Sequence, residues 1–334
     1  MMSKTEKLWL ELEKSNSFAS GIVMKRYSAE SISDAFAALL MPEKIKSIAF
    51  RFNKKFSNDF IIINNLKDIK IQFIQDKEQK EKQLLILSLS DNELTDIFAV
   101  LCEDLFQSIA NITIESEFVK TLRDRFEQWK ELFERVRNKE LSLEDQKGLF
   151  GELYLLQKMI IATDKSLFCV NLWKGPELGI RDFEYNMWAV EVKTTTTHNQ
   201  QKLFISSERQ LDCSHLKNLY LFHLSVEVRT GSIFTLNSII DNLKTKIGPN
   251  IQAMIVFNMK LLKAGYFKVD RKKYAKISYE IRAEKYYQVR DDFPRIEEKD
   301  LRTNVGNVKY SIIPPENDKY IVSFEEIIKS IGAI

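Results

Sequence analysis

The sequence lacks any apolar run long enough to span a membrane, and its first residues, Met-Met-Ser-Lys-Thr-Glu-Lys, form no apolar signal segment. It has only three cysteines in 334 residues, Cys102, Cys169 and Cys213. These are widely spaced and odd in number, with no second thiol or histidine at metal-ligand spacing, which argues against a disulfide framework and a zinc site. We therefore expect a soluble protein of the reducing cytoplasm, with no membrane partner.

An excess of charge of one sign is also missing. The chain has 50 Lys and Arg against 47 Asp and Glu, a formal net charge of +3. A nearly neutral chain has no global field that attracts nucleic acid, so any such contact must be a local patch. Internal repeats and low-complexity segments are absent too, and the length suits roughly two or three domains.

The most informative stretch is residues 180–194, which predicts a β-hairpin. On its second strand Val190 and Val192 alternate with Glu191 and Lys193. Because side chains alternate along a strand, the carboxylate and the amine share one face and the valines pack behind. An ordinary exposed hairpin with an ion pair is the plain alternative, since acid-x-Lys triplets are common in a chain so rich in Asp, Glu and Lys.

An upstream carboxylate extends the pattern. A turn near Asn186 would fold Asp182 back beside Glu191. Two carboxylates, the backbone carbonyl of Val192 and a phosphate oxygen make a shell that suits Mg²⁺, for which Mn²⁺ would substitute. The ion would polarise the phosphoryl oxygen and acidify a water, while Lys193 orients that water or stabilises the developing charge. The pattern predicts phosphodiester hydrolysis.

Residues 142–160 predict a helix with Ser142 as its N-cap. Glu152 falls at the edge of the apolar stripe, where a carboxylate is poorly solvated and no residue of the helix pairs with it. We expect it to join the metal site, directly or through a water; the alternative is a Glu that reaches solvent. Gly148 and Gly151 would let another segment approach closely.

Glu152 on a helix, then Asp182, then Glu191-Val-Lys193, followed by a strand and a helix, resembles the PD-(D/E)XK nuclease superfamily. The resemblance implies that all four are catalytic, with Asp182 and Glu191 as metal-binding acids, Lys193 as the motif lysine and Glu152 as the acid of the first core helix. Arg181 stands where the motif has its proline. Glu184 lies on the strand face of Asp182, so either acid is a candidate metal ligand.

Further stretches resemble a bacterial family of PD-(D/E)XK motif proteins: Gly-Leu-Phe-Gly-Glu-Leu in the helix, Glu-Val-Lys-Thr in the hairpin, and residues 205–211 and 287–296. The genes of its members tend to lie beside genes for DNA methyltransferases and ATPases in antiphage defence loci. The resemblance therefore implies DNA as substrate and such proteins as partners.

The implied fold is α/β, with a restriction-endonuclease-like core over residues 141–230, a mixed central sheet flanked by helices. Apolar alternation at 46–52, 60–63, 69–74 and 84–89 predicts strands of an N-terminal α+β module, residues 1–112. Its helix over 93–106 would be capped by Asp91 or Asn92.

Residues 113–140 contain an amphipathic connecting helix. Its apolar stripe would cover one side of the catalytic domain or form the seam of a homodimer. Residues 231–334 form an α+β extension that begins with a helix capped by Asn237 or Ser238.

Basic and aromatic residues interleave between 266 and 290, where tyrosines would pack on sugars or bases. An ordinary exposed antiparallel sheet explains the pattern equally well. The candidate DNA contacts of the chain are Arg209, Gln210, Lys272, Lys273 and Arg282.

The residues and the resemblance together predict a Mg²⁺-dependent endodeoxyribonuclease of the restriction type, in antiphage defence. The alternative is a DNA-binding or scaffolding subunit of a multi-protein complex that is active only with a partner ATPase. RNA cleavage is a third hypothesis, because the hydrolytic site reads phosphate and not the 2′-hydroxyl.

Overall fold

The computed structural model describes residues 3–15, 20–29, 34–56, 68–76, 79–136, 140–196, 202–231, 233–315 and 319–332, without the side chains of 93 and 131–136. The chain folds into two compact units, Met1–Lys139 with Phe267–Val269, and Glu140–Tyr266 with Asp270–Ile334. Both combine helices and sheets, which confirms the α/β class. The finer division into four segments stays a prediction. No helix of the described residues is long and apolar enough to cross a membrane.

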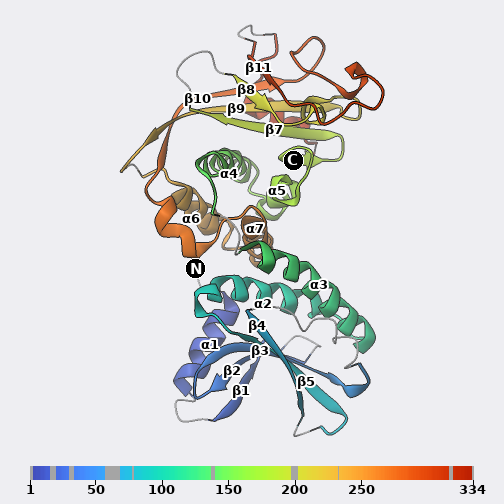
Figure 1. Ribbon diagram of the computed structural model, residues 1–334, viewed down its shortest axis with the longest axis vertical. Helices are drawn as coiled ribbons and strands as arrows, with labels where there is room; N and C mark the ends of the chain where they lie inside the picture. Colours follow the sequence, from blue (N-terminus) through green and yellow to red (C-terminus); the bar gives the residue numbers. More distant parts are fainter. Residues whose placement is uncertain are drawn as a thin grey trace. The chain divides into compact units, whose positions relative to one another are not determined.

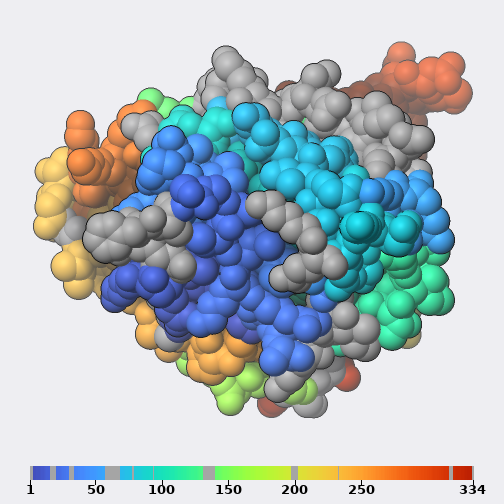
Figure 2. Space-filling view, turned by 90° about the horizontal axis from the view of Figure 1, so that it is seen from below, coloured from blue at the N-terminus to red at the C-terminus, as the bar shows by residue number. Residues whose placement is uncertain are grey.

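The first unit is built on a five-stranded antiparallel sheet with the strand order β1-β2-β3-β5-β4. Its strands are β1 (Gly21–Arg26), β2 (Ala35–Met41), β3 (Ile45–Asn53), β4 (Ile69–Gln75) and β5 (Lys82–Leu89). Its helices are α1 (Lys4–Ser15), α2 (Thr95–Ile109) and α3 (Glu115–Val136). The predicted strand at 60–63 lies outside the described residues. Residues of α1 to β3 fill the middle of the face seen in Figure 2.

The predicted cap of α2 is wrong. A short 3-10 turn, η2 (Asn92–Leu94), precedes the helix, so that Leu94 is the N-cap and no side chain caps it. Asp91 and Asn92 therefore lie too early to act as N-caps.

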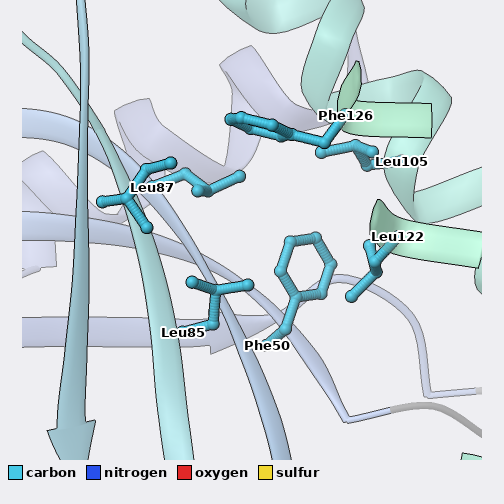
Figure 3. Close-up of a pocket in the computed structure, with 7 residues that line it drawn as sticks. Phe50, Leu85, Leu87, Leu105, Leu122 and Phe126 are labelled. Carbon is cyan, nitrogen blue, oxygen red and sulfur yellow. The ribbon is translucent and has the colours of Figure 1, made fainter. Parts of the chain in front are cut away.

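The amphipathic helix is present as α3, and the described part of its apolar stripe packs within the first unit. Phe118, Leu122, Phe126 and Trp129 are buried within the first unit. Figure 3 shows Leu122 and Phe126 facing apolar side chains of the sheet and of α2, among them Leu87. The apolar face of a sheet must be covered by another layer, and α3 supplies it. These four side chains are consequently not free to form a dimer seam.

The second unit contains a mixed four-stranded sheet with the order β10-β9-β7-β6. Its strands are β6 (Phe183–Tyr185), β7 (Trp188–Thr195), β9 (Asn218–Arg229) and β10 (Ser278–Gln288). Strand β7 runs parallel to β9, and the other pairs are antiparallel. Strand β8 (Leu203–Ile205) pairs with β11 (Tyr310–Ile312) in a separate small sheet.

Helices cover one face of this sheet and the small sheet covers the other (Figure 1). The helices are α4 (Leu143–Thr163), α5 (Ser166–Leu172), α6 (Leu236–Ile247), α7 (Ile251–Lys263), α8 (Arg271–Tyr274) and α9 (Phe324–Ser330). Ser142 caps α4 as predicted, in a reciprocal capping box with Asp145. The cap of α6 is Thr235, two or three residues earlier than predicted, because the Thr235 hydroxyl accepts the Ser238 N–H.

The tyrosines of the interleaved stretch are core residues, so their predicted contact with sugars or bases is wrong. Tyr274, Tyr279, Tyr286 and Tyr287 are all buried. Along β10 the rings of Tyr286 and Tyr287 point to opposite faces of the sheet and are buried in the two cores on either side, whereas the charged side chains of Glu280, Arg282 and Lys285 are exposed.

One glycine of α4 permits its close packing on β7. A Cβ added at Gly151 would lie 1.9 Å from Thr194 Oγ1 and 3.2 Å from Thr194 Cβ, whereas a Cβ at Gly148 would meet nothing within 4 Å. The expected close approach is thus confirmed at Gly151 only.

This difference gives a matched prediction. Gly151→Ala is expected to lower the free energy of unfolding by about 1–3 kcal/mol, because the Thr194 side chain must change rotamer or α4 and β7 must move apart. Gly148→Ala is expected to raise it by about 0.5–1 kcal/mol, since alanine favours an open helical position. Urea unfolding curves measure both, and equal effects of the two substitutions would refute the packing argument.

Candidate active site

The hairpin predicted from the sequence is present. Tyr185 pairs with Trp188, so that Asn186 and Met187 form a two-residue turn between β6 and β7. Asn186 has a positive φ of 52°, which such tight turns require and asparagine tolerates. The turn fixes the register, and the register decides which side chains of β7 share a face.

Alternation along β7 brings Glu191 and Lys193 together. Val190 and Val192 join the core beside α4. The Lys193 Nζ lies 2.6 Å from Glu191 Oε1. Glu191 is only 1% exposed, and its Oε2 has no hydrogen-bond partner in the described part of the chain. A buried carboxylate oxygen without a partner calls for a missing cation or water.

Asp182 lies immediately before β6 and is fixed from two directions. Its Oδ2 accepts the backbone N–H of Val192 at 2.8 Å. Its backbone carbonyl accepts the N–H groups of Lys174 at 2.7 Å and Gly175 at 3.1 Å. These bonds join the hairpin to the loop that follows α5.

Asp182 and Glu184 have different surroundings, although both were candidates for the first acid. The Glu184 Oε1 accepts the backbone N–H of Arg181 at 3.2 Å and lies 3.6 Å from the Arg181 guanidinium. Glu184 is therefore neutralised by its own neighbour, and Asp182 is the acid beside Val192 and Gly175.

Glu152 extends from α4 toward Asp182 and Gly175. A hydrogen bond that the helix pattern does not predict holds its carboxylate there. The indole Nε1 of Trp173 donates to Glu152 Oε2 at 2.7 Å. A Cβ built on Gly175 would lie 2.6 Å from Glu152 Oε2 and 3.1 Å from Asp182 Oδ1. The two carboxylates thus face one point, which stays open because residue 175 is glycine. We call Glu152, Asp182, Glu191 and Lys193 the carboxylate cluster.

Burial raises the pKa of all three acids. It brings the pKa of Glu152 to about 7, against the hydrogen bond from Trp173. Burial and the charges of Glu191 and Glu152 hold the pKa of Asp182 well above its ordinary value. Burial also raises the pKa of Glu191, despite Lys193. Burial lowers the pKa of Lys193, but attraction to Glu191 and Asp182 prevails and raises it. Three acids share one ammonium, so the cluster is short of positive charge.

A divalent cation would supply the missing charge. The described residues hold no group of three or more His, Cys, Asp or Glu side chains that would bind a metal unaided. An ion would therefore need backbone and water ligands beside the carboxylates, a shell that suits Mg²⁺. The Glu191 oxygen without a partner and the open point at Gly175 are consistent with such an ion.

Arg181 holds the turn that contacts Lys193. Its guanidinium donates to the backbone carbonyls of Arg209 at 2.7 Å, Gln210 at 3.0 Å and Asp212 at 2.7 Å. These residues belong to or follow the 3-10 turn η4 (Glu208–Leu211). The Gln210 Oε1 in turn accepts from Lys193 Nζ at 3.2 Å. Gln210, predicted as a phosphate contact, here contacts the motif lysine.

The other predicted DNA contacts lie on three separate elements. Arg209 belongs to η4, Lys272 and Lys273 to α8, and Arg282 to β10. Acidic partners occupy several of them: Arg209 pairs with Glu298, Lys273 with Glu140, and Arg282 with Glu227. Contact of these residues with DNA stays a prediction.

Two residues of the site, Trp173 and Gly175, were not among the predicted ones, and both lie in the loop between α5 and β6. The Gly175-Pro176 dipeptide is a turn signal that marks this loop. Nothing in the sequence indicates that the indole reaches a helix 21 residues earlier.

The hydrogen bond to Glu152 leads to a prediction for Trp173→Phe. The indole N–H favours the charged carboxylate, so its loss raises the pKa of Glu152 further above about 7. At pH 7 more Glu152 is then protonated, and the Mn²⁺ concentration for half-saturation of the carboxylate cluster is expected to rise about tenfold. Raising the pH to 9 should restore most of the loss.

Trp188→Phe is the matched control, because the buried indole of Trp188 donates to the Ser330 hydroxyl instead. Titrations with Mn²⁺ at pH 7 and pH 9, followed by electron paramagnetic resonance, compare the two variants. An unchanged metal requirement in Trp173→Phe would contradict the role of this hydrogen bond.

Comparison with known proteins identifies the family. Residues 5–313 match the family model described as "Putative PD-(D/E)XK family member, (DUF4420)". No curated protein and no solved structure matches the chain at a significant level. The matched region includes most of both units and every residue of the carboxylate cluster, and its description indicates a nuclease-like function. The chain belongs to this DUF4420 family, within the PD-(D/E)XK superfamily.

Proposed function

We propose that the protein is a Mg²⁺-dependent DNA endonuclease of the restriction type, with a restriction-endonuclease-like core in its second unit. The observation that carries this proposal is the carboxylate cluster, where three acids of raised pKa surround one lysine. Such perturbed acids gather at catalytic sites more often than at structural ones. The family description supports the same reading.

Each residue of the cluster has a proposed role. Asp182, Glu191 and the backbone carbonyl of Val192 would hold the ion, and Glu152 would act through a water. Bound there, Mg²⁺ or Mn²⁺ would polarise a phosphoryl oxygen and lower the pKa of a water. The Lys193 ammonium, kept charged by Glu191 at 2.6 Å, would stabilise the negative charge that develops on the phosphate.

The reaction is hydrolysis of a phosphodiester bond. A water oxygen attacks phosphorus and loses a proton to solvent, while the bond from phosphorus to the leaving sugar oxygen breaks. That oxygen takes up a proton, so atoms and charge balance without a further reactant. Asp182 and Glu191 are fixed by Val192 and Lys193 before substrate arrives, which limits reorganisation during the reaction.

A role in antiphage defence, beside a DNA methyltransferase and an ATPase, belongs to the same proposal and is supported by the resemblance of the sequence motifs. The partly buried, ion-paired Lys193 favours an active enzyme over a scaffolding subunit, since a structural site has no need of three acids around one amine.

Incubation of the purified protein with supercoiled plasmid tests this proposal. With Mg²⁺ or Mn²⁺ we expect nicked or linear products, and with EDTA none. Methylated and unmethylated plasmids run in parallel, with a single-stranded RNA as the alternative substrate. Cleavage of RNA alone would replace the DNA assignment. DNA binding without cleavage under any condition would favour the subunit that depends on a partner ATPase.

A further inference from the structure

Three lysines surround one carboxylate in the loop that carries Gly175. The Glu177 carboxylate lies 3.4 Å from the Nζ of Lys260, 3.5 Å from that of Lys174 and 3.7 Å from that of Lys263. Glu177 ends the short turn η3 (Gly175–Glu177), and two of the lysines come from α7. We call Lys174, Lys260 and Lys263 the lysine cluster. Its charge exceeds that of Glu177 by two.

The geometry differs from that of an ordinary ion pair. In the same unit the pair of Lys158 and Glu284 is an example of the ordinary kind, with one ammonium 2.5 Å from one carboxylate. Glu177 instead lies between three ammonium groups, each beyond the 2.7–2.9 Å typical of a charged hydrogen bond. One carboxylate with two oxygens is a poor match for three cations, whereas a phosphate offers more charge and more acceptors.

Burial makes the excess charge costly. Lys260 is only 3% exposed, and its ammonium also donates to the backbone carbonyl of Trp173. Burial lowers the pKa of Lys260 to about 8; Glu177 opposes this effect, and Lys174 and Lys263 add to it. Among the described residues, Glu177 is the acid within ion-pair distance of all three. An additional anion would therefore be stabilised here.

The lysine cluster adjoins the carboxylate cluster along the chain and in space. The backbone N–H of Lys174 donates to the carbonyl of Asp182, and Gly175 lies against Glu152 and Asp182. Helix α5, which leads into this loop, packs against α7 (Figure 1). A DNA strand whose reacting phosphate lies at the carboxylates would bring a neighbouring phosphate of its backbone toward these lysines.

We propose that Lys174, Lys260 and Lys263 bind a backbone phosphate of the DNA strand, and that Glu177 occupies the place of this phosphate until DNA arrives. The inference rests on the proposed nuclease function and adds a phosphate subsite with a displaceable internal anion. Glu177 thereby lowers the affinity of the lysine cluster for phosphate, because the incoming anion must displace it.

Fluorescence anisotropy with a labelled duplex DNA of about 30 base pairs tests the subsite, in EDTA so that cleavage plays no part. Glu177→Gln is expected to tighten binding about threefold to tenfold, because the competing anion is lost. Lys263→Ala and Lys174→Ala are each expected to weaken binding about threefold to tenfold and to reduce the slope of log K against log salt by about one. Both lysines are partly exposed, so these variants should fold.

Lys319→Ala is the control, since Lys319 is an exposed lysine of the same unit paired with Asp292. Affinities of the Glu177, Lys174 and Lys263 variants equal to that of this control would overturn the phosphate subsite, and the lysines would then only stabilise the loop. If the wild type cleaves plasmid and the variants show this result, the subsite is refuted and the proposed nuclease function stands. A wild-type chain that neither binds nor cleaves DNA refutes the proposed function and the subsite together.

Discussion

Lys193→Met is expected to lower the rate of DNA cleavage by about 10²–10³-fold, the usual cost of removing one group that stabilises developing charge. Methionine keeps the length and packing of the side chain but has no charge. Glu191 is then left buried without its 2.6 Å partner. Because burial already raises the pKa of Glu191, this acid can take up a proton and the fold can persist.

Single-turnover cleavage of plasmid measures the effect, and circular dichroism checks the fold. Lys158→Met is the matched control, because Lys158 also forms an ion pair in the second unit, with Glu284, outside the carboxylate cluster. Full cleavage by Lys193→Met, or an equal loss in the control, would remove Lys193 from the chemistry.

Asp182→Asn is expected to abolish cleavage and yet to stabilise the metal-free protein. The substitution removes an acid whose charged form is disfavoured by burial and by two neighbouring acids. The amide oxygen of the asparagine can still accept the hydrogen bond from the Val192 N–H, which lies 2.8 Å from Asp182 Oδ2 in the wild type. We expect a gain of about 1–2 kcal/mol, which is common when a functional site is relieved of a destabilising group. That gain corresponds to a rise in Tm of about 2–8 °C.

The gain depends on pH in a defined direction. The pKa of Asp182 is raised in the folded state, so the unfolded chain releases this proton first as the pH increases. The stability that Asp182 contributes to the wild-type protein is fully present below the pKa of this group in the unfolded chain, near 3.8. It is lost as the pH rises toward the raised pKa of the folded state. Asparagine does not titrate. The advantage of the variant should therefore be small at pH 4 and large at pH 8.

Thermal unfolding in EDTA at both pH values tests this expectation. Glu184→Gln is the matched control, because Glu184 is compensated by Arg181 and its removal relieves no repulsion. A lower Tm for Asp182→Asn at pH 8 would contradict the electrostatic description of the cluster.

Local patterns predicted the hairpin and the helix beside it. The register of β6 and β7 follows from a two-residue turn, and the shared face of Glu191 and Lys193 follows from strand alternation. The start of α4 follows from its capping box at Ser142. Each of these features depends on residues that are near one another in the sequence, where chain geometry leaves few choices.

Contacts between distant segments were not predictable in this way. The Trp173 indole that holds Glu152, and the three carbonyls held by Arg181, depend on how elements 21 to 31 residues apart pack together. The sequence predicts the apolar stripe of α3, but an amphipathic pattern does not indicate which surface the stripe will cover. The tyrosines of β10 were misjudged because interleaved charge also fits a half-buried strand.

The central claim is that the carboxylate cluster binds one divalent cation, and titration with Mn²⁺ followed by electron paramagnetic resonance tests it most directly. The account predicts about one tightly bound Mn²⁺ per chain for the wild type and for Glu184→Gln, and at least about tenfold weaker binding for Asp182→Asn and Glu191→Gln. Unchanged Mn²⁺ binding in both of these variants, or loss of binding in Glu184→Gln alone, would contradict it.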